Sequence, residues 1–249
     1  MHILITGAAG RLAQAVADEL GRDHRVRLMD RVPIQPADKM DFFQGDLLDP
    51  RDVWQAVRGI DTVIHTATPP PDLPASGLAR DQALLDLGTR GTHVLLSAAV
   101  QAGVRRCIYA GTLRLFDAYP DDVYITENYK PLPPLDMESM SNYLGELGCR
   151  EFTYAHPLTG TSLRLGTLVL EEKTEGLAPD PSWLDRRDAA RAFRCALHRD
   201  AGEQMVAAQR WQVYHVCAAV SNPRFLLHAA RQLGYAPEHN FQRPLSRAS

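Results

Sequence analysis

The sequence predicts a doubly wound α/β fold with a mainly parallel sheet and a small C-terminal lobe. Short apolar segments alternate with amphipathic segments long enough for helices, which is typical of right-handed βαβ units. A glycine turn at residues 7–10 joins the first apolar segment to the first amphipathic one. Because no internal repeat or low-complexity linker interrupts the chain, we expect one continuous fold over 1–249, with a core over 1–165 and a lobe over 166–249.

The composition is that of a globular protein with a sizeable core. Of the 249 residues, 45% are hydrophobic and 23% are charged, which excludes a disordered chain, a collagen-like repeat and a coiled coil. Lysine and arginine together number 27 against 30 acidic residues, for a formal net charge of -3. Since no basic block is present, the chain lacks the electrostatic footprint of a nucleic-acid-binding protein.

The first half of the chain shows the alternation of strands and helices most clearly. The apolar run 3–5 predicts a strand over 2–6. Leu12, Val16 and Leu20 share one helical face and predict a helix over 11–20. Further strands are expected at 25–29 and at 62–65, and further helices from Pro50 and over 78–102.

The second half continues the pattern after a strand at 107–110. A loop-rich segment follows over 112–140, where several prolines interrupt any regular structure. After it, helices are expected at 143–154, 186–198 and 223–233, and strands at 162–165 and 212–216.

The cysteines and the hydropathy pattern point to a cytoplasmic protein. Four cysteines, Cys107, Cys149, Cys195 and Cys217, stand far apart among apolar residues, so we expect buried, reduced thiols and no metal site. No apolar run approaches the about 20 residues of a membrane span. The only apolar stretch at the start is 3–5, so we expect no signal peptide.

The turn at 6–13, Thr-Gly-Ala-Ala-Gly-Arg-Leu-Ala, has the spacing of a dinucleotide-binding turn in a Rossmann-type fold. Gly7 permits the turn out of the strand, Gly10 lets a diphosphate approach the backbone, and Ala13 keeps the helix close to the sheet. The unpaired N–H groups at the helix start suit an anion. We expect the following residues to contact the cofactor here: Gly7, Ala9, Gly10, Arg11 and Leu12.

Asp30 favours NAD over NADP as the cofactor. It ends the second predicted strand, 20 residues after Gly10. A carboxylate at this place accepts hydrogen bonds from the ribose hydroxyls and repels a 2′-phosphate. Arg11 and Arg31 are the counter-argument, because either guanidinium could pair with that phosphate.

Several motifs in the same order resemble the extended short-chain dehydrogenase/reductase family, in particular its NAD-dependent epimerases and dehydratases. Besides the turn at 6–13, the similar segments are Gly-Asp-Leu-Leu-Asp at 45–49, His-Thr-Ala-Thr at 65–68, Arg-Gly-Thr at 90–92, Thr-Glu-Asn at 126–128 and Asp-Ala-Ala-Arg-Ala at 188–192. The resemblance covers nearly the whole chain.

The resemblance implies roles for individual residues. Thr112 takes the place of the family's active-site hydroxyl, Tyr143 that of its catalytic tyrosine, and Glu151 that of a glutamate that often follows. The residues that it places beside the cofactor are Asp46 and Leu47 at the adenine, then Thr66, Ala67, Thr68, Ala110, Tyr143 and Leu165.

The chain departs from the family at two positions. Leu147 stands four residues after Tyr143, where the family has lysine, and Gly88 stands where it usually has asparagine. A lysine at i+4 shares the helix face of the tyrosine, and its ammonium lowers the pKa of a neighbouring phenol from about 10. No tyrosine of the chain has lysine four residues later, so a shifted motif does not restore the pattern.

Three explanations of Leu147 stay open at the level of sequence. Arg150 or Arg114 could supply the missing charge. The site could use another acid or base, such as His65 or Glu146, although a histidine at a strand end is more typically packed and hydrogen-bonded. Or the protein could bind a dinucleotide without turning it over.

The sequence therefore predicts an NAD-dependent oxidoreductase, or an epimerase or dehydratase, acting on a hydroxyl or carbonyl of a small polar, sugar-like substrate. The alternative is a catalytically impaired sensor or assembly protein of the same fold that binds NAD or NADP. Because the lobe after Leu165 is short, we expect a smaller ligand than a nucleotide-sugar, or a site completed by a partner subunit. The resemblance also implies a homodimer.

Overall fold

The computed structural model describes residues 1–38, 40–69, 73–178, 180–199 and 206–241, and a parallel sheet forms its centre. The sheet has seven strands in the order β3-β2-β1-β4-β5-β6-β9, and every neighbouring pair is parallel. The strands are β1 His2–Thr6, β2 Arg25–Asp30, β3 Asp41–Gln44, β4 Thr62–His65, β5 Arg106–Thr112, β6 Thr159–Leu165 and β9 Trp211–Val216. The doubly wound α/β fold is thereby confirmed.

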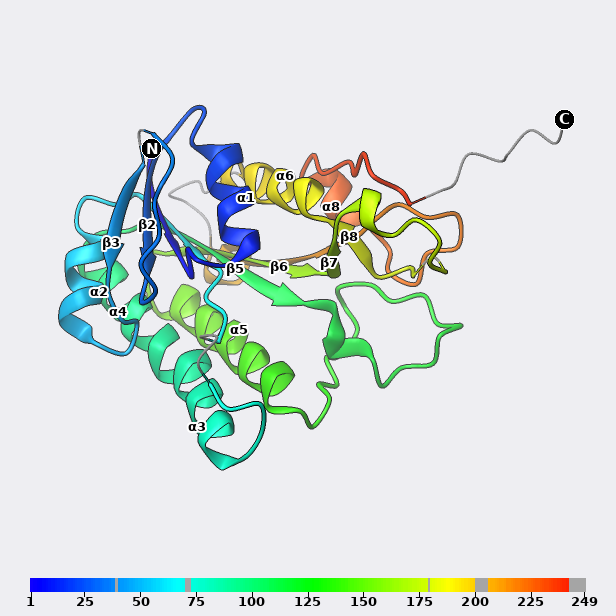
Figure 1. Ribbon diagram of the computed structural model, residues 1–249, viewed down its shortest axis with the longest axis horizontal. Coiled ribbons are helices and arrows are strands. Elements are labelled where there is room, and N and C mark those ends of the chain that lie inside the picture. The colour runs from blue at the N-terminus through cyan, green and yellow to red at the C-terminus, as the bar shows by residue number, and fades with distance from the viewer. Residues whose placement is uncertain (39, 70–72, 179, 200–205, 242–249) are drawn as a thin grey trace, which may run out of the picture.

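Helices cover both faces of the sheet (Figure 1). One face carries α1 Arg11–Leu20, α6 Arg186–Leu197 and α8 His228–Gln232. The other face carries α2 Pro50–Val57, α3 Leu78–Asp86, α4 Thr92–Gln101 and α5 Met137–Ala155. A short helix, α7 Ala207–Arg210, precedes β9.

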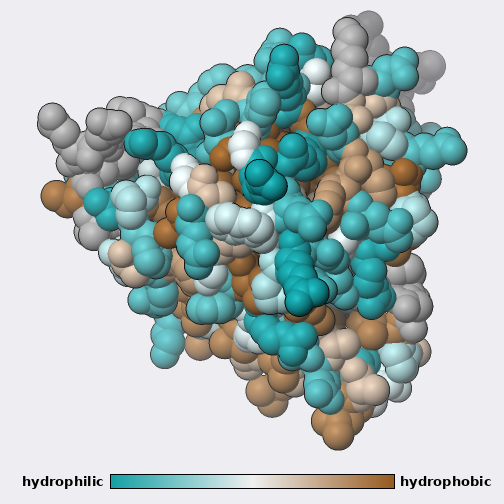
Figure 2. Space-filling view, turned by 90° about the vertical axis from the view of Figure 1, so that its left-hand side faces the viewer, coloured by the Kyte–Doolittle hydropathy of each residue, from teal (hydrophilic) through white to brown (hydrophobic). Residues whose placement is uncertain are grey.

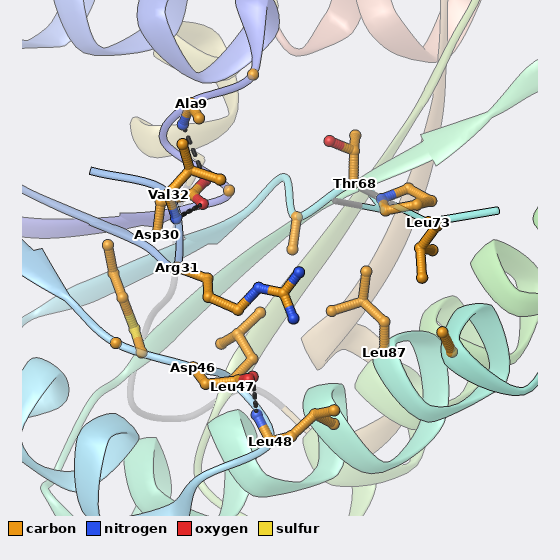
Figure 3. A pocket seen from close by; sticks show the side chains of 17 residues that line it. Ala9, Asp30, Arg31, Val32, Asp46, Leu47, Leu48, Thr68, Leu73 and Leu87 are labelled. Atoms are coloured by element: carbon orange, nitrogen blue, oxygen red, sulfur yellow. Dashed lines mark hydrogen bonds between the residues drawn. The ribbon is translucent and has the colours of Figure 1, made fainter. Parts of the chain in front are cut away.

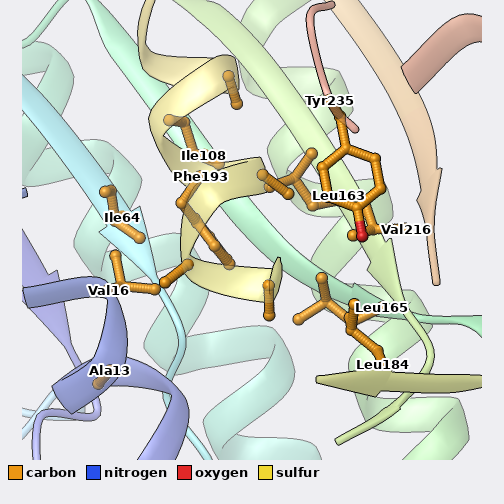
Figure 4. Close-up of a cluster of buried hydrophobic side chains, with 14 of the residues drawn as sticks. Ala13, Val16, Ile64, Ile108, Leu163, Leu165, Leu184, Phe193, Val216 and Tyr235 are labelled. Carbon is orange, nitrogen blue, oxygen red and sulfur yellow. The ribbon is translucent and has the colours of Figure 1, made fainter. Parts of the chain in front are cut away.

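A hydrophobic core lies on each face of the sheet. On the α1 and α6 face, Val16 and Phe193 pack over Ile64 and Ile108 of the central strands, as Figure 4 shows. On the other face, side chains of α2, α4 and α5 cover β1, β4 and β5. The strands are buried on both sides, which explains why they appear in the sequence as short apolar runs.

The strand order reverses at β1, whose neighbours are β2 on one side and β4 on the other. In open α/β sheets, ligands bind outside the carboxyl ends of the strands at this switch point. The turn after β1 and the segment after β4 therefore stand at the place where a ligand is expected.

Three expectations about the elements were wrong in detail. Helix α5 begins at Met137 instead of 143, because the Asp136 carboxylate caps it by accepting a hydrogen bond from the Ser139 N–H at 2.8 Å. The helical stretch 78–102 is divided by a π-helical turn, Leu87–Gly91, and α8 begins at His228 instead of 223. The lobe also contains a small parallel pair of strands, β7 Thr167–Val169 and β8 Trp183–Asp185, that the sequence did not predict.

The sheet edge formed by β3 is short, and its end residues Asp41 and Gln44 are exposed. Polar edge residues disfavour pairing with another chain, and Figure 2 shows mostly hydrophilic side chains on the face of the molecule at this end of the sheet.

Among the described residues, no helix is long and apolar enough to cross a membrane. The four cysteines are unpaired; three are buried and Cys195 is half-buried.

Candidate active site

The turn after β1 can accept a diphosphate because two glycines shape it. Gly7 has φ +76°, and a Cβ there would lie 2.5 Å from Ala67 Cα, so only glycine fits this close approach to the segment after β4. Gly10 is the N-cap of α1 and offers no side chain to bond the first N–H groups of the helix. These donors, with the positive end of the helix dipole, favour a bound anion.

Asp30, the last residue of β2, holds this turn in place. Its Oδ2 accepts a hydrogen bond from the Ala9 N–H at 2.9 Å, and its Oδ1 accepts one from the Val32 N–H at 2.9 Å (Figure 3). A carboxylate has about four acceptor positions. The two backbone bonds therefore leave capacity for ribose hydroxyls.

A cavity of about 340 Å³ opens between this turn, the end of β2 and the segments after β3 and β4. Nine of the residues predicted to contact the cofactor line it: Gly7, Ala9, Gly10, Asp30, Arg31, Asp46, Leu47, Ala67 and Thr68. The Arg31 side chain extends into the middle of the cavity, between the Asp46 segment and Thr68 (Figure 3). The sequence motifs thus converge on one cavity at the switch point.

The Asp46 segment forms one wall of the cavity. Asp46 Oδ1 accepts a hydrogen bond from the Leu48 N–H at 2.8 Å, and the Asp46 N–H donates to Asp52 Oδ2 at 2.9 Å. Further apolar lining that the sequence did not indicate comes from Met29, Val32, Leu48, Leu73, Ala83 and Leu87. Leu48 stands in the Gly-Asp-Leu-Leu-Asp segment at 45–49. The other five follow no motif and reach the cavity from β2, α3, the π-helical turn and the loops.

The other predicted residues lie outside this cavity. The Thr66 hydroxyl points inward and donates to the Thr6 carbonyl at 2.7 Å. Leu12, Ala110 and Tyr143 are half-buried against the hydrophobic core of the α1 and α6 face. Arg11 lines a second cavity, and Thr112 and Leu165 line a third.

Thr112 lies at the carboxyl end of β5, and its cavity has a volume of about 400 Å³. Its Oγ1 accepts a hydrogen bond from the Arg114 N–H at 3.2 Å, so its O–H remains available as a donor. Tyr143 lies on α5, which is tied to β5 where the Asn142 amide donates to the Ala110 carbonyl at 3.1 Å.

Asp117 is a titratable group in the Thr112 cavity that the sequence did not indicate. Partial burial raises the pKa of its carboxyl above the ordinary value, against the lowering effect of the Arg114 and Arg224 charges. No motif marks it, because only the turn after β5 brings it to this cavity.

The arginines proposed as replacements for the missing lysine are engaged with carboxylates. Arg114 lies 3.0 Å from Asp136 and 3.8 Å from Asp117. Arg150 lies 2.8 Å from Glu151, its neighbour on the exposed side of α5. Within the part of the chain that the structure describes, neither has an ion pair or hydrogen bond with Tyr143.

Gly88 has a packing explanation. A Cβ at Gly88 would collide with the Ser141 hydroxyl and carbonyl, and a Cβ at Gly145 would collide with the Tyr109 hydroxyl and lie 3.0 Å from the Gly88 carbonyl. The two glycines allow α5 to lie directly on the π-helical turn. A side chain at position 88 would push away the helix that carries Tyr143.

The two other acid–base candidates have structural roles. His65 is 4% exposed and hydrogen-bonded to Thr6 at 2.7 Å and to Thr92 at 3.1 Å, and burial lowers its pKa to about 4. Glu146 is 3% exposed and accepts hydrogen bonds from Arg164 at 2.6 and 3.0 Å. Neither lines any of the three cavities, so the suggestion that they replace the lysine is not supported.

Comparisons with known proteins agree with this geometry. A profile of the NAD dependent epimerase/dehydratase family matches residues 3–180. An NAD-dependent glucose-6-phosphate dehydrogenase of Haloferax volcanii is 27% identical over 260 residues, which cover 96% of this chain and 93% of that protein.

Two solved structures share the fold. Glucuronic acid dehydrogenase from Chromohalobacter salexigens superposes with a TM-score of 0.79 at 21% identity, over 97% of this chain and 85% of that one. A mutant uronate dehydrogenase from Agrobacterium tumefaciens in complex with NAD superposes with a TM-score of 0.76 at 20% identity. The match covers 95% of this chain and 84% of that one.

The fold and the glycine-turn cavity define a dinucleotide-binding protein of the Rossmann class. Since the profile matches well over half of the sequence, the chain belongs to the NAD dependent epimerase/dehydratase family. This membership confirms NAD as the cofactor and an NAD-dependent enzyme as the class. The cavity fits the cofactor, because the first N–H groups of α1 have no side-chain cap and the Asp30 carboxylate keeps acceptor capacity for ribose hydroxyls. Among the described residues, no cluster of three His, Cys, Asp or Glu side chains could hold a metal ion.

Proposed function

We propose that the protein is an NAD-dependent oxidoreductase or epimerase that acts on a hydroxyl or carbonyl of a small, sugar-like substrate. The observation that carries the proposal is the place of Thr112, which lines a cavity at the carboxyl end of β5. The neighbouring strand in the sheet is β4, and the segment after β4 lines the cofactor cavity. The relative that is 27% identical is named for a sugar phosphate substrate, which supports the substrate class.

We assign the chemistry at the substrate oxygen to Thr112 and Tyr143. NAD, when bound, accepts a hydride from the substrate carbon. The Thr112 hydroxyl donates a hydrogen bond to the substrate oxygen, and Tyr143 Oη is the group that takes up its proton in the oxidative direction. In the reductive direction the phenol returns that proton to the oxygen.

A second candidate function is favoured by Leu147. With no lysine on the Tyr143 face of α5, and with Arg114 and Arg150 engaged by carboxylates, the chain could bind NAD tightly without turnover. It would then act as a cofactor-binding sensor or assembly protein.

Replacement of Tyr143 separates the two candidates. For the enzyme, we expect Tyr143→Phe to lower kcat by about 10²–10⁴-fold, the usual contribution of a positioned proton donor or acceptor, with the affinity for NAD little changed. The measurement is NADH formation over a panel of sugars, sugar acids and sugar phosphates, with NAD affinity measured by calorimetry. Tyr124→Phe is the matched control, since Tyr124 is exposed.

One outcome would contradict the role given to Tyr143, and another would contradict the enzyme assignment itself. Unchanged turnover in Tyr143→Phe would remove Tyr143 from the chemistry. A wild-type protein that binds NAD and reduces none of it, combined with turnover in Leu147→Lys, would establish the second candidate.

We extend the proposal to organisation and location. Residues 1–165 form the dinucleotide-binding core, residues 166–249 form a short substrate lobe, and the protein is a cytoplasmic homodimer. The predicted core contains six of the seven sheet strands, and the later segment contains β7 and β8 together with α6 and β9, which return to the sheet. The dimer rests on the family resemblance, and light scattering would distinguish it from a 27.6 kDa monomer.

A further inference from the structure

A cavity of about 540 Å³ lies between the first residue of α1 and the β7–β8 lobe. Among the described residues, three cationic side chains line it, Arg11, Lys173 and Arg186, and no acidic side chain does. In the described part of the chain, none of the three forms an ion pair with a carboxylate. The cavity therefore concentrates positive charge that no carboxylate of the described residues neutralises in an ion pair.

The acidic residues next to these cations in the sequence have other partners. Arg187 lies 2.8 Å from both Glu172 and Asp185. Glu171 accepts a hydrogen bond from the Phe241 N–H at 2.8 Å. Glu171, Glu172 and Asp185, the carboxylates nearest to Lys173 and Arg186 in the sequence, are thus engaged by other groups.

Arg11 adds to the unbalanced charge because of its place in α1. It is the first residue of the helix, and the first turn contains no acidic residue. The N-terminal end of a helix carries a partial positive charge, which disfavours a cation and favours an anion. A bound anion would stabilise both the guanidinium and the helix end.

The rest of the cavity is apolar, with one aromatic ring. Trp183 lines it together with Leu168 and Leu177, and its ring packs edge-on against Phe241 with centroids 5.4 Å apart. Aromatic rings offer a rigid apolar surface of large area. The lining thus combines cations for a charged group with a flat surface for the carbon skeleton that bears it.

Residues that line this cavity adjoin residues that line the two cavities of the candidate active site. Arg11 directly follows Gly10, which lines the cofactor cavity. Thr167, which precedes Leu168 and pairs with Trp183 in the β7–β8 ladder, lines the Thr112 cavity. A molecule that reaches from Thr112 across β7 would place its far end among the three cations.

We propose that this cavity binds the anionic group, phosphate or carboxylate, of the substrate. The inference rests on the proposed function and narrows its substrate class to acidic, sugar-like molecules. Lys173 and Arg186 are positioning residues, because they hold the charged end of the substrate away from the reacting carbon.

Inorganic phosphate is the probe, titrated by calorimetry into the purified full chain, with and without saturating NAD. We expect phosphate to bind in both conditions. Lys173→Glu should weaken this binding by about tenfold or more, since it replaces a charge-assisted contact with a repulsive charge. Lys130→Glu is the matched control, because Lys130 is also exposed and lines none of the cavities described above.

The outcomes distinguish the anion's source and separate this inference from the proposed function. Loss of phosphate binding when NAD is present would assign the cations to the cofactor's own diphosphate and overturn the inference. Absence of phosphate binding to the wild type, or equal weakening by Lys130→Glu, would also overturn it. NAD affinity and turnover, measured in the same variants, report on the proposed function independently.

Discussion

Asp30 shows how one side chain can serve the fold and the site together. Its two oxygens accept hydrogen bonds from Ala9 and Val32, which fix the glycine turn against the end of β2. The same carboxylate lines the cofactor cavity. The sequence predicted its place from the spacing to Gly10, whereas its bond to the turn required the three-dimensional structure.

We expect the free energy of unfolding to fall in mild acid because of the buried side chains of His65 and His215. Burial lowers the pKa of His65 to about 4 and, together with the Arg164 charge, that of His215 to about 3. Because the unfolded chain protonates histidine near pH 6.5, it binds more protons than the folded protein below that pH. The free energy of unfolding should therefore decrease by roughly 2 kcal/mol for each histidine between about pH 7 and about pH 5.

Urea unfolding at several pH values measures this effect. His65→Gln should reduce the slope of the unfolding free energy against pH, because the variant loses one of the two linked protonations. His93→Gln, at an exposed position of α4, should keep the wild-type slope. Equal slopes in wild type and His65→Gln would show that His65 is not held neutral by the fold.

At the scale of elements, α5 connects the site to the sheet. It begins at the Asp136 cap, and Gly145 lets it approach the π-helical turn. Its buried Glu146 pairs with Arg164 of β6 at 2.6 Å. The sequence indicated a helix around Tyr143, but not its earlier start or this pair, because both depend on contacts between distant segments.

Because Glu146 and Arg164 form a buried ion pair, we expect the replacement of Glu146 by glutamine to destabilise the protein strongly. Glu146→Gln leaves a buried guanidinium without a charged partner, so we expect the free energy of unfolding to fall by about 3–5 kcal/mol. Glu151→Gln, which affects only an exposed pair with Arg150, should change it by less than about 1 kcal/mol. Chemical denaturation of both variants makes the comparison, and equal losses would contradict the structural role given to Glu146.

At the scale of the molecule, the sequence predicted the sheet and the cofactor side of the site better than the substrate side. Strands buried on both faces and a glycine turn both leave local patterns in the sequence. The topology of a parallel sheet then brings the residues after β1, β2, β3 and β4 together at one end of the sheet. The β7–β8 pair, Asp117 and the cationic cavity leave no such pattern. Asp117 reaches its cavity through the turn after β5, and the other two arise where an irregular lobe folds back on the core.

The measurement that tests the central claim most directly is a calorimetric titration of the cofactor-free protein with NAD⁺ and with NADP⁺. The structure predicts one NAD⁺ bound per chain and about tenfold or weaker binding of NADP⁺, because the Asp30 carboxylate accepts the ribose hydroxyls and repels a 2′-phosphate. Equal or tighter binding of NADP⁺, with Arg31 holding that phosphate, would contradict the role assigned to Asp30. Failure of both dinucleotides to bind would contradict the cofactor site itself.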